Sequence, residues 1–363
     1  MLEFVIPCLL GLESLVGDEI RKLGLSDVRV ENGRVLCHGE ARDIARLNIN
    51  LRCGARVILV LHKFRATDFE SLFQGVRAVH WEDWIPREGE FPVVGYSINS
   101  TLHSVPACQS IVKKAVVDRL SAAYGIAQFP ETGRRYQVRF SIMKDHVELF
   151  LDTSGAHGVA APLKETLAAA MVKLSHYNGR DPFCDPFCGS GTIAIEAALI
   201  ARNRAPGLNR SFAAQHWATL DKMLWLDAAD EAMDKEFHGK YEIWGGDIDP
   251  DAVELSRHNA ELAEVDDIVK FEVDDATRFH WGGLYGRIVT NPPYGERLLE
   301  REEAGELYKA FGKAMDKLPD TWRVYVLSSH PDFERCYGRF ADKKRKLYNG
   351  MLKCDFFMYG KRL

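Results

Sequence analysis

The chain has 363 residues, of which 46% are hydrophobic and 27% are charged, as in an ordinary globular protein with two or three domains. Its net charge of −5 at pH 7 excludes a surface that is strongly basic throughout, so a nucleic-acid partner would have to bind a local basic face. No apolar run approaches the roughly 18 residues of a membrane span, and the N-terminus lacks the basic region of a signal peptide. We therefore expect a cytoplasmic protein with no membrane partner.

The first 155 residues predict two small α+β units. Residues 1–55 predict strands at 4–7, 28–30 and 35–37 and helices at 11–23 and 41–51. Residues 56–155 predict strands at 56–61, 91–96, 136–142 and 147–151 and helices at 69–79 and 107–124. The strands at 136–142 and 147–151 are expected to pair.

From about residue 162 the pattern changes to alternating strands and helices. The predicted strands are 183–185, 241–245, 269–273, 287–290 and 323–327, and the predicted helices are 192–202, 250–263 and 304–318. A terminal antiparallel hairpin is predicted around Asn349-Gly350, and residues 203–240 are interpreted as an insertion. This order predicts an α/β fold with a mostly parallel, doubly wound sheet closed by a hairpin.

The cysteines do not indicate a metal site. The chain has eight cysteines, and none of them forms a C-x-x-C pair. We expect free, mostly buried thiols and no bound metal.

Acidic and glycine residues follow three of the predicted strands. Asp185 ends the first of them, and Gly189 and Gly191 open the helix that follows, where backbone N–H groups favour a carboxylate. Asp185 itself could accept from an ammonium group. Asp247 closes the second strand and could accept from the hydroxyls of a ribose, and Asp275, after the third, from an adenine amino group. Together these features indicate S-adenosylmethionine.

The stretch Asn291-Pro292-Pro293-Tyr294 follows the strand at 287–290. Two prolines cannot continue a ladder of hydrogen bonds, so the backbone must leave the sheet here. The Asn291 side-chain carbonyl and the Pro292 backbone carbonyl could accept the two hydrogens of an exocyclic amine, while Tyr294 stacks on the base. The motif predicts methylation of an amino nitrogen on a planar base.

The chain resembles a known family at these motifs. Residues 185–192, 246–250 and 291–297 are similar to those of class I methyltransferases that modify guanine N2 in RNA. Residues 161–168 also resemble the bacterial ribosomal RNA guanine-N2 methyltransferases that carry a THUMP module, of the UPF0020 type.

The resemblance implies a Rossmann-like class I methyltransferase domain preceded by ferredoxin-like and THUMP domains. The expected divisions are 1–55 for the ferredoxin-like part, 56–155 for the RNA-binding THUMP domain and 156–363 for the methyltransferase domain. The stretch at 156–161 is shorter than in such relatives, which usually have a longer basic segment there.

The expected site residues combine the motifs and the resemblance. The catalytic candidates are Asn291, Pro292 and Tyr294. The cofactor-binding candidates are Thr166, Asp185, Phe187, Cys188, Gly189, Gly191, Thr192, Asp247, Ile248, Asp275, Ala276 and Asn291. The expected cofactor is S-adenosylmethionine, and the expected partner is 23S ribosomal RNA or a large-subunit assembly intermediate.

Basic residues offer candidate RNA contacts in both halves of the chain. These are Lys113, Lys114, Arg134, Arg135, Arg139 and the run Lys343-Lys344-Arg345-Lys346. For any one of them, a solvated charged face is the more ordinary explanation.

Two other functions remain open from the sequence. An adenine-N6 methyltransferase acting on DNA or RNA would use the same Asn-Pro-Pro-Tyr chemistry. A non-catalytic RNA-binding or assembly factor would keep the domains but transfer no methyl group.

Overall fold

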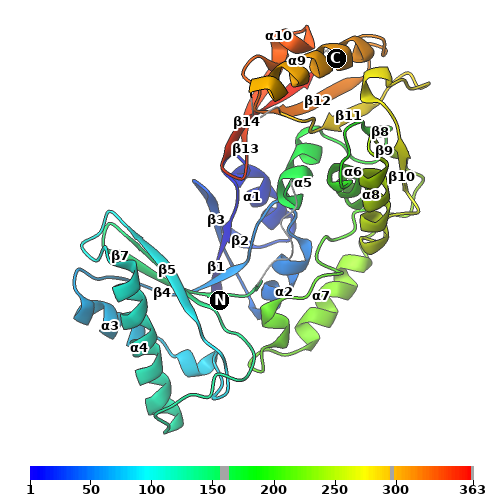
Figure 1. Cartoon of the computed structure of the whole chain (residues 1–363). Coiled ribbons are helices and arrows are strands. Elements are labelled where there is room, and N and C mark those ends of the chain that lie inside the picture. The colour runs from blue at the N-terminus through cyan, green and yellow to red at the C-terminus, as the bar shows by residue number, and fades with distance from the viewer. Residues whose placement is uncertain (156–162, 295–297, 361–363) are drawn as a thin grey trace. The chain divides into compact units, whose positions relative to one another are not determined.

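The computed structural model describes residues 1–155, 163–294 and 298–360, which form two compact units. The first unit comprises Met1–Cys8, Val16–Val159 and Arg210–Glu231, and the second comprises Leu9–Leu15, Ala160–Asn209 and Ala232–Leu363. Each unit is built on a seven-stranded sheet (Figure 1).

The sheet of the first unit has the strand order β2-β3-β1-β4-β7-β6-β5. Its strands are β1 Leu2–Pro7, β2 Ser26–Glu31, β3 Arg34–Gly39, β4 Ile58–Arg65, β5 Val93–Ile98, β6 Val138–Met143 and β7 His146–Asp152. Neighbouring strands are antiparallel except for the parallel pair β5–β6, and β6 pairs with β7 as predicted. Because β4 pairs with β1 on one side and β7 on the other, the two α+β parts share one continuous sheet.

The helices of the N-terminal half agree with the predicted ones to within a few residues. They are α1 Glu13–Lys22, α2 Ala41–Asn50, α3 Phe69–Arg77 and α4 Val105–Tyr124, with a 3-10 helix at Trp81–Asp83. The side chain of Asp68 caps α3 by accepting from Ser71 N–H at 2.8 Å, a contact that stabilises a helix N-terminus by about 1 kcal/mol.

Part of the predicted insertion at 203–240 belongs to the first unit. This part contains a 3-10 helix, Ala213–His216, and most of α7 Met223–Met233. The Trp217 ring stacks on Tyr136 with centroids 5.0 Å apart, and its indole N–H donates to the Arg135 carbonyl at 3.0 Å. Both rings are almost completely buried, so this segment contributes to the core of the first unit.

The sheet of the second unit has the order β10-β9-β8-β11-β12-β14-β13. Its strands are β8 Phe183–Asp185, β9 Ile243–Asp247, β10 Val269–Val273, β11 Arg287–Thr290, β12 Arg323–Ser328, β13 Lys343–Asn349 and β14 Leu352–Tyr359. Strands β8 to β12 are parallel, whereas β14 runs antiparallel to both β12 and β13. The prediction of a doubly wound sheet with a terminal hairpin is confirmed.

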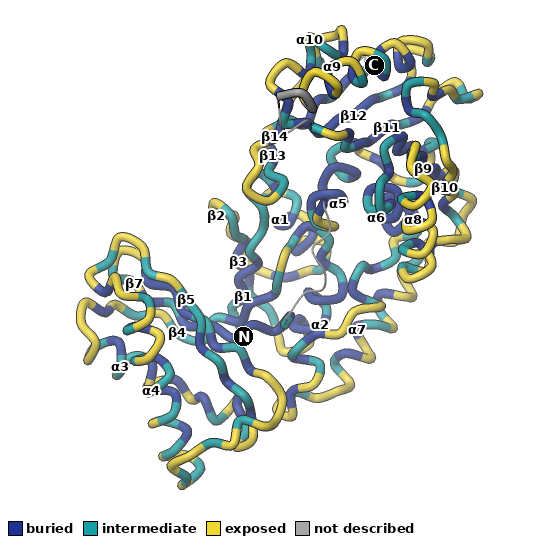
Figure 2. The backbone as a smooth tube through the Cα atoms, in the orientation of Figure 1, coloured by how far each residue is buried: buried dark blue, intermediate teal, exposed yellow. Residues whose placement is uncertain are grey.

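The helices of this unit are α5 Glu165–Leu174, α6 Thr192–Ala201, α8 Pro250–Leu262, α9 Leu298–Met315 and α10 Phe333–Tyr337. Helices α5 and α6 are buried along most of their length, whereas α8 is largely exposed (Figure 2). None of the helices in the described ranges is long and apolar enough to cross a membrane.

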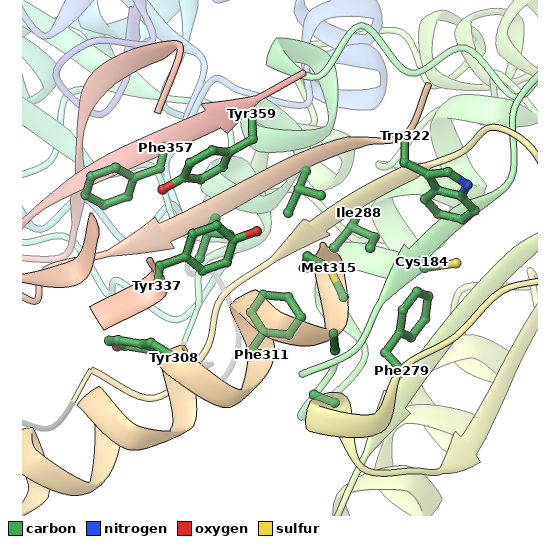
Figure 3. Close-up of a cluster of buried hydrophobic side chains, with 14 of the residues drawn as sticks. Cys184, Phe279, Ile288, Tyr308, Phe311, Met315, Trp322, Tyr337, Phe357 and Tyr359 are labelled. Carbon is green, nitrogen blue, oxygen red and sulfur yellow. The ribbon is translucent and has the colours of Figure 1, made fainter. Parts of the chain in front are cut away.

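Aromatic side chains fill the core between the sheet and the helices α9 and α10 (Figure 3). Phe311 of α9 lies among buried residues that include Tyr337 of α10 and Phe357 of β14. Phe333 stacks on Phe357 with centroids 4.5 Å apart. This packing fixes α9, whose Tyr308 reaches the loop after β11.

Candidate active site

A cavity of about 440 Å³ lies where the parallel strands β8, β9 and β11 end. Its lining includes most of the residues proposed from the sequence: Asp185, Phe187, Cys188, Gly189, Thr192, Asp247, Ile248, Asp275, Ala276, Asn291, Pro292 and Tyr294. Thr166, on α5, and Gly191, before α6, do not line it. Carboxyl ends of parallel strands meet at one edge of the sheet, which explains why motifs far apart in the sequence converge.

The side chain of Asp185 is fully buried, and only one of its two carboxylate oxygens accepts hydrogen bonds. Its Oδ1 accepts from the Thr290 hydroxyl at 2.6 Å and from Phe187 N–H at 3.3 Å. Its Oδ2 has no hydrogen-bond partner among the described residues. Burial, with a smaller contribution from the charge of Asp247, raises the pKa of the carboxyl to about 7, while the two hydrogen bonds oppose this shift. The Oδ2 atom is thus an unused acceptor of a residue that lines the cavity, although almost none of its own surface is exposed.

The two positions in the loop after β8 are occupied by glycine for different structural reasons. Gly189 has a φ of +53° and open space where a Cβ would lie, and its N–H donates to Oδ2 of Asp247 at 2.9 Å. Gly191 has a φ of +81°, and a Cβ there would lie 2.7 Å from the Ser256 Cβ. Gly189 therefore shapes the cavity wall, whereas Gly191 is required by close packing behind it.

Cys188 lies in the same loop but has no nucleophilic character. It is buried, and burial raises the pKa of its thiol far above the ordinary value, so the sulfur stays protonated at neutral pH. Its N–H donates to the Gly246 carbonyl at 2.9 Å, which ties the loop to the end of β9. We interpret Cys188 as an apolar part of the cavity wall.

Two further carboxylates face the cavity and also organise their own loops. Asp247 accepts from Gly189 N–H and, through Oδ1, from Asp249 N–H at 3.0 Å. Asp275 uses Oδ1 to accept from both the N–H and the hydroxyl of Thr277, which lower the pKa of its carboxyl. Since each carboxylate oxygen has two lone pairs, both groups keep acceptor capacity toward a ligand.

The loop after β11 is held from behind by α9. The Tyr308 hydroxyl donates to the Pro293 carbonyl at 2.5 Å and lies 3.3 Å from the Ser328 hydroxyl. Burial raises the pKa of Tyr308 to about 12, so it remains a donor at neutral pH. Within the loop, the Tyr294 hydroxyl donates to Oδ1 of Asn291. This contact was not expected from the sequence, which gave Tyr294 only a stacking role.

The cavity also includes residues that the sequence did not single out: Leu163, Pro186, Ser190, Ile193, Pro293, Leu307 and Asn349. Asn349 comes from the end of β13, and no sequence signal places a hairpin residue beside the loop after β11. Gly295, Glu296 and Arg297, and the short stretch at 156–161, lie outside the described residues.

A sheet of this order, with acidic residues at the ends of neighbouring strands and an Asn-Pro-Pro-Tyr loop after β11, defines a class I methyltransferase. The chain belongs to the UPF0020 family, whose model, described as an RMKL-like methyltransferase domain, matches residues 156–357. A RlmL ferredoxin-like domain model matches residues 3–58, and a THUMP domain model matches residues 66–152.

Individual relatives cover almost the whole chain. The Bacillus subtilis (strain 168) protein "Putative RNA methyltransferase YpsC" is 44% identical over 96% of this chain and 94% of its own length. A Listeria monocytogenes structure, described as a predicted N6-adenine-specific DNA methylase, has a TM-score of 0.94 and 44% identity, covering 99% of this chain and 96% of that one. The structure of SMU.472, described as a putative methyltransferase complexed with SAH, has a TM-score of 0.93 and 40% identity. The match covers 100% of this chain and 99% of that one.

Proposed function

We propose that this protein transfers the methyl group of S-adenosylmethionine to the exocyclic N2 of a guanine in 23S ribosomal RNA. The observation that carries the proposal is one cavity lined both by Asp185, Asp247 and Asp275 and by the loop from Asn291 to Tyr294. The first group suits the cofactor and the second suits an amino nitrogen. Membership of a methyltransferase family and the SAH complex of SMU.472 support the choice of cofactor.

The donor and acceptor groups of the cavity fit S-adenosylmethionine. The unsatisfied Oδ2 of Asp185 suits its ammonium group, and pairing would compensate the burial of that carboxylate. Asp247 suits the ribose hydroxyls, and the remaining oxygen of Asp275 suits the adenine amine. Ile248 and Ala276 supply apolar surface beside them. When bound, the cofactor would supply an electrophilic methyl group, with S-adenosylhomocysteine as the leaving group and one proton released from the methylated nitrogen to water.

The loop after β11 would hold the guanine amine in a reactive geometry. The lone pair of this nitrogen is delocalised into the ring, so the amine is a weak nucleophile. Hydrogen bonds from its two hydrogens to Oδ1 of Asn291 and to the Pro292 carbonyl favour a pyramidal nitrogen and direct its lone pair into the cavity. Positioning rather than a strong base would then supply most of the rate. The target base must leave its stack to reach the site.

The THUMP match supports RNA as the substrate, and the structure narrows the candidate contacts. Several candidates are engaged within the protein. Lys113 donates to Glu131 and to the Phe91 carbonyl, Lys344 to Glu334, and Arg345 to the Gly11 carbonyl, while Arg135 and Arg139 lie within 3.7 and 3.5 Å of Glu90 and Asp152. The domain division at 55/56 and 155/156 remains a prediction.

In the second unit, the surface that we propose contacts RNA is the β13–β14 hairpin. Tyr348 lies opposite Lys353 in the register, and Lys346 is two residues before Tyr348 on the same face. Both lysines are exposed, and neither makes an ion pair within 4.0 Å among the described residues. Asp355, opposite Lys346, offsets one of the two charges. Two cations beside an aromatic ring suit a single strand of RNA.

Replacing Asn291 by alanine tests the assignment. Asn291→Ala should abolish methyl transfer, because the amine loses a hydrogen-bond acceptor that positions it, while affinity for S-adenosylhomocysteine changes by less than about threefold. The assay is transfer of labelled methyl groups to ribosomal RNA from a strain that lacks the gene. Asn178→Ala, at an exposed position outside the cavity, is the matched control. Unchanged turnover in Asn291→Ala would refute the assignment.

One alternative has a specific observation in its favour. The Listeria relative is described as an adenine-specific DNA methylase, and the same loop could bind an adenine N6 amine. Incubating RNA and DNA separately with labelled cofactor and identifying the methylated nucleoside decides between the two. A non-catalytic RNA-binding factor is disfavoured by membership of a methyltransferase family.

A further inference from the structure

A buried hydrogen bond from Thr290 connects the two halves of the proposed site. Thr290 is the last residue of β11, directly before Asn291, and its side chain is completely buried. Its hydroxyl donates to Oδ1 of Asp185 at 2.6 Å. Asp185 ends the neighbouring parallel strand, β8. The bond therefore joins the carboxylate proposed for the cofactor to the residue that precedes the amide proposed for the substrate amine.

The backbone does not make this connection at the end of β11. On the β12 side, the pairing of β11 continues to Thr290, which lies opposite Val326. On the β8 side, the pairing ends at Ile288, two residues earlier. The Thr290 hydroxyl thus extends the link between β11 and β8 by a side-chain contact, at the point where the backbone turns into the motif loop.

The same bond acts on the Asp185 carboxylate in two ways. With Oδ1 held by the Thr290 hydroxyl and by Phe187 N–H, Oδ2 is the oxygen left for a ligand. The bond also favours the ionised form, because a hydroxyl donates a stronger hydrogen bond to a charged oxygen than to a neutral one. Burial raises the pKa of Asp185 to about 7, and the Thr290 bond opposes this rise.

Other titratable groups near Asp185 do not replace this contribution. Asp247, at the end of β9, acts in the opposite direction, because its negative charge raises the pKa of Asp185. Burial raises the pKa of the Cys184 and Cys188 thiols, so both stay protonated at neutral pH and add no charge. Removing the Thr290 hydroxyl should therefore leave Asp185 less ionised.

We propose that Thr290 is a positioning residue that orients the Asp185 carboxylate for the ammonium group of the cofactor and fixes the end of β11 so that Asn291 meets the amine. This inference rests on the proposed function. Its two parts are measured separately, the first by cofactor affinity and the second by turnover.

The pH dependence of affinity tests the first part. Thr290→Val removes the hydroxyl and keeps a branched side chain of similar shape. If the pKa of Asp185 then rises from about 7 to roughly 8, the variant should bind S-adenosylhomocysteine roughly eightfold more weakly than the unmodified protein at pH 6.5, threefold at pH 7.5 and less than about twofold at pH 8.5. Calorimetric titrations of the full-length chain give these ratios, in which protonation of the ligand itself cancels. Thr290→Ser, which keeps the hydroxyl, should stay within about twofold throughout.

Thr277→Val is the matched control for the cofactor site. The Thr277 hydroxyl donates to Oδ1 of Asp275 at 2.7 Å, a contact of the same kind. Hydrogen bonds from Thr277 lower the pKa of Asp275, so this carboxylate stays ionised between pH 6.5 and pH 8.5. Any loss of affinity in the control should therefore be the same at the three pH values.

Methyl transfer at pH 8.5 with saturating S-adenosylmethionine tests the second part. The cofactor site is then filled in both proteins, so a lower kcat reports on the motif loop. Thr290→Val should lower kcat roughly tenfold, because the reacting amine is held less accurately, and Thr290→Ser should keep most of the activity. The substrate is ribosomal RNA from a strain that lacks the gene. Thr290→Ala, which also lacks the hydroxyl and has a smaller side chain, repeats both measurements and removes any effect of valine packing.

The inference is wrong if Thr290→Val and Thr290→Ala lose affinity equally at the three pH values, as a merely structural role predicts, or if both keep the full kcat. Failure of the proposed function would look different. An adenine product would refute guanine specificity and leave both measurements valid. Full activity in Asn291→Ala would refute the role of Asn291 and the second part of the inference, whereas the affinity ratios would still test the first.

Discussion

We expect the buried carboxylate of Asp185 to make cofactor binding depend on pH. Burial raises its pKa to about 7 from an ordinary value of 3.8, since water no longer solvates the charge. An ammonium group on Oδ2 pairs only with the ionised form, so protons compete with the ligand. Asp185→Asn keeps an acceptor for Thr290 and removes the charge.

The size of the effect follows from the ionised fraction. With a pKa of about 7, roughly three quarters of Asp185 is ionised at pH 7.5 and about 3% at pH 5.5, so affinity should fall roughly 25-fold between these values. Asp185→Asn should bind roughly 100-fold more weakly at pH 7.5, because a charge-assisted hydrogen bond is lost, and its affinity should no longer depend on pH.

Calorimetric titration with S-adenosylhomocysteine at pH 5.5, 6.5 and 7.5 measures both effects. Asp251→Asn, at an exposed position on α8, is the matched control and should keep the pH dependence of the unmodified protein. The reasoning is refuted if the unmodified protein binds equally at the three pH values, or if Asp185→Asn binds as tightly as the unmodified protein.

The remaining predictions concern the stability of the ligand-free protein, the support of the motif loop and the RNA surface. Because the folded pKa of Asp185 is raised, its proton stabilises the fold at low pH and this contribution is lost as pH rises through 7. Asp185→Asn should therefore gain about 2–3 kcal/mol in unfolding free energy, relative to the unmodified protein, between pH 5 and pH 8; a constant difference in urea denaturation would contradict this. Tyr308→Phe removes the bond to the motif loop and should lower kcat roughly tenfold at unchanged S-adenosylhomocysteine affinity, whereas an equal loss of both would indicate general unfolding. Replacing Lys346 and Lys353 together by alanine should weaken binding of a fluorescent 12-nucleotide oligouridylate several-fold and reduce its salt dependence. The control replaces two other exposed lysines by alanine, Lys313 near the end of α9 and Lys317 in the turn after it, and the same loss there would exclude a specific hairpin contact.

The sequence predicted the parts of the fold that depend on local pattern. The alternation of strands and helices after residue 162 and the hairpin signal at Asn349-Gly350 gave the doubly wound sheet and its terminal hairpin. Helix α5 was missed, because its sequence is apolar and alanine-rich with buried residues on most sides and therefore has no amphipathic stripe. Helix α10 was missed because five residues are too few to show a period.

The sequence likewise predicted some residues of the candidate site and not others. Asp185 and Asn291 could be grouped from the sequence because each lies at the end of a predicted parallel strand. The carboxyl ends of parallel strands meet at one edge of the sheet. The contribution of Asn349 depends on how far the hairpin extends past that edge, which the sequence does not encode locally. Likewise, Tyr136 and Trp217 are far apart in sequence, so their stacking within the first unit could be found only from the structure.

Identification of the methylated nucleoside tests the central claim most directly. The full-length protein is incubated with labelled S-adenosylmethionine and ribosomal RNA from a strain that lacks the gene, and the RNA is digested to nucleosides and analysed by mass spectrometry. The account predicts label in N2-methylguanosine from 23S RNA and none when Asn291 is replaced by alanine. Label in N6-methyladenosine, or label in a parallel incubation with DNA but none in RNA, would contradict it.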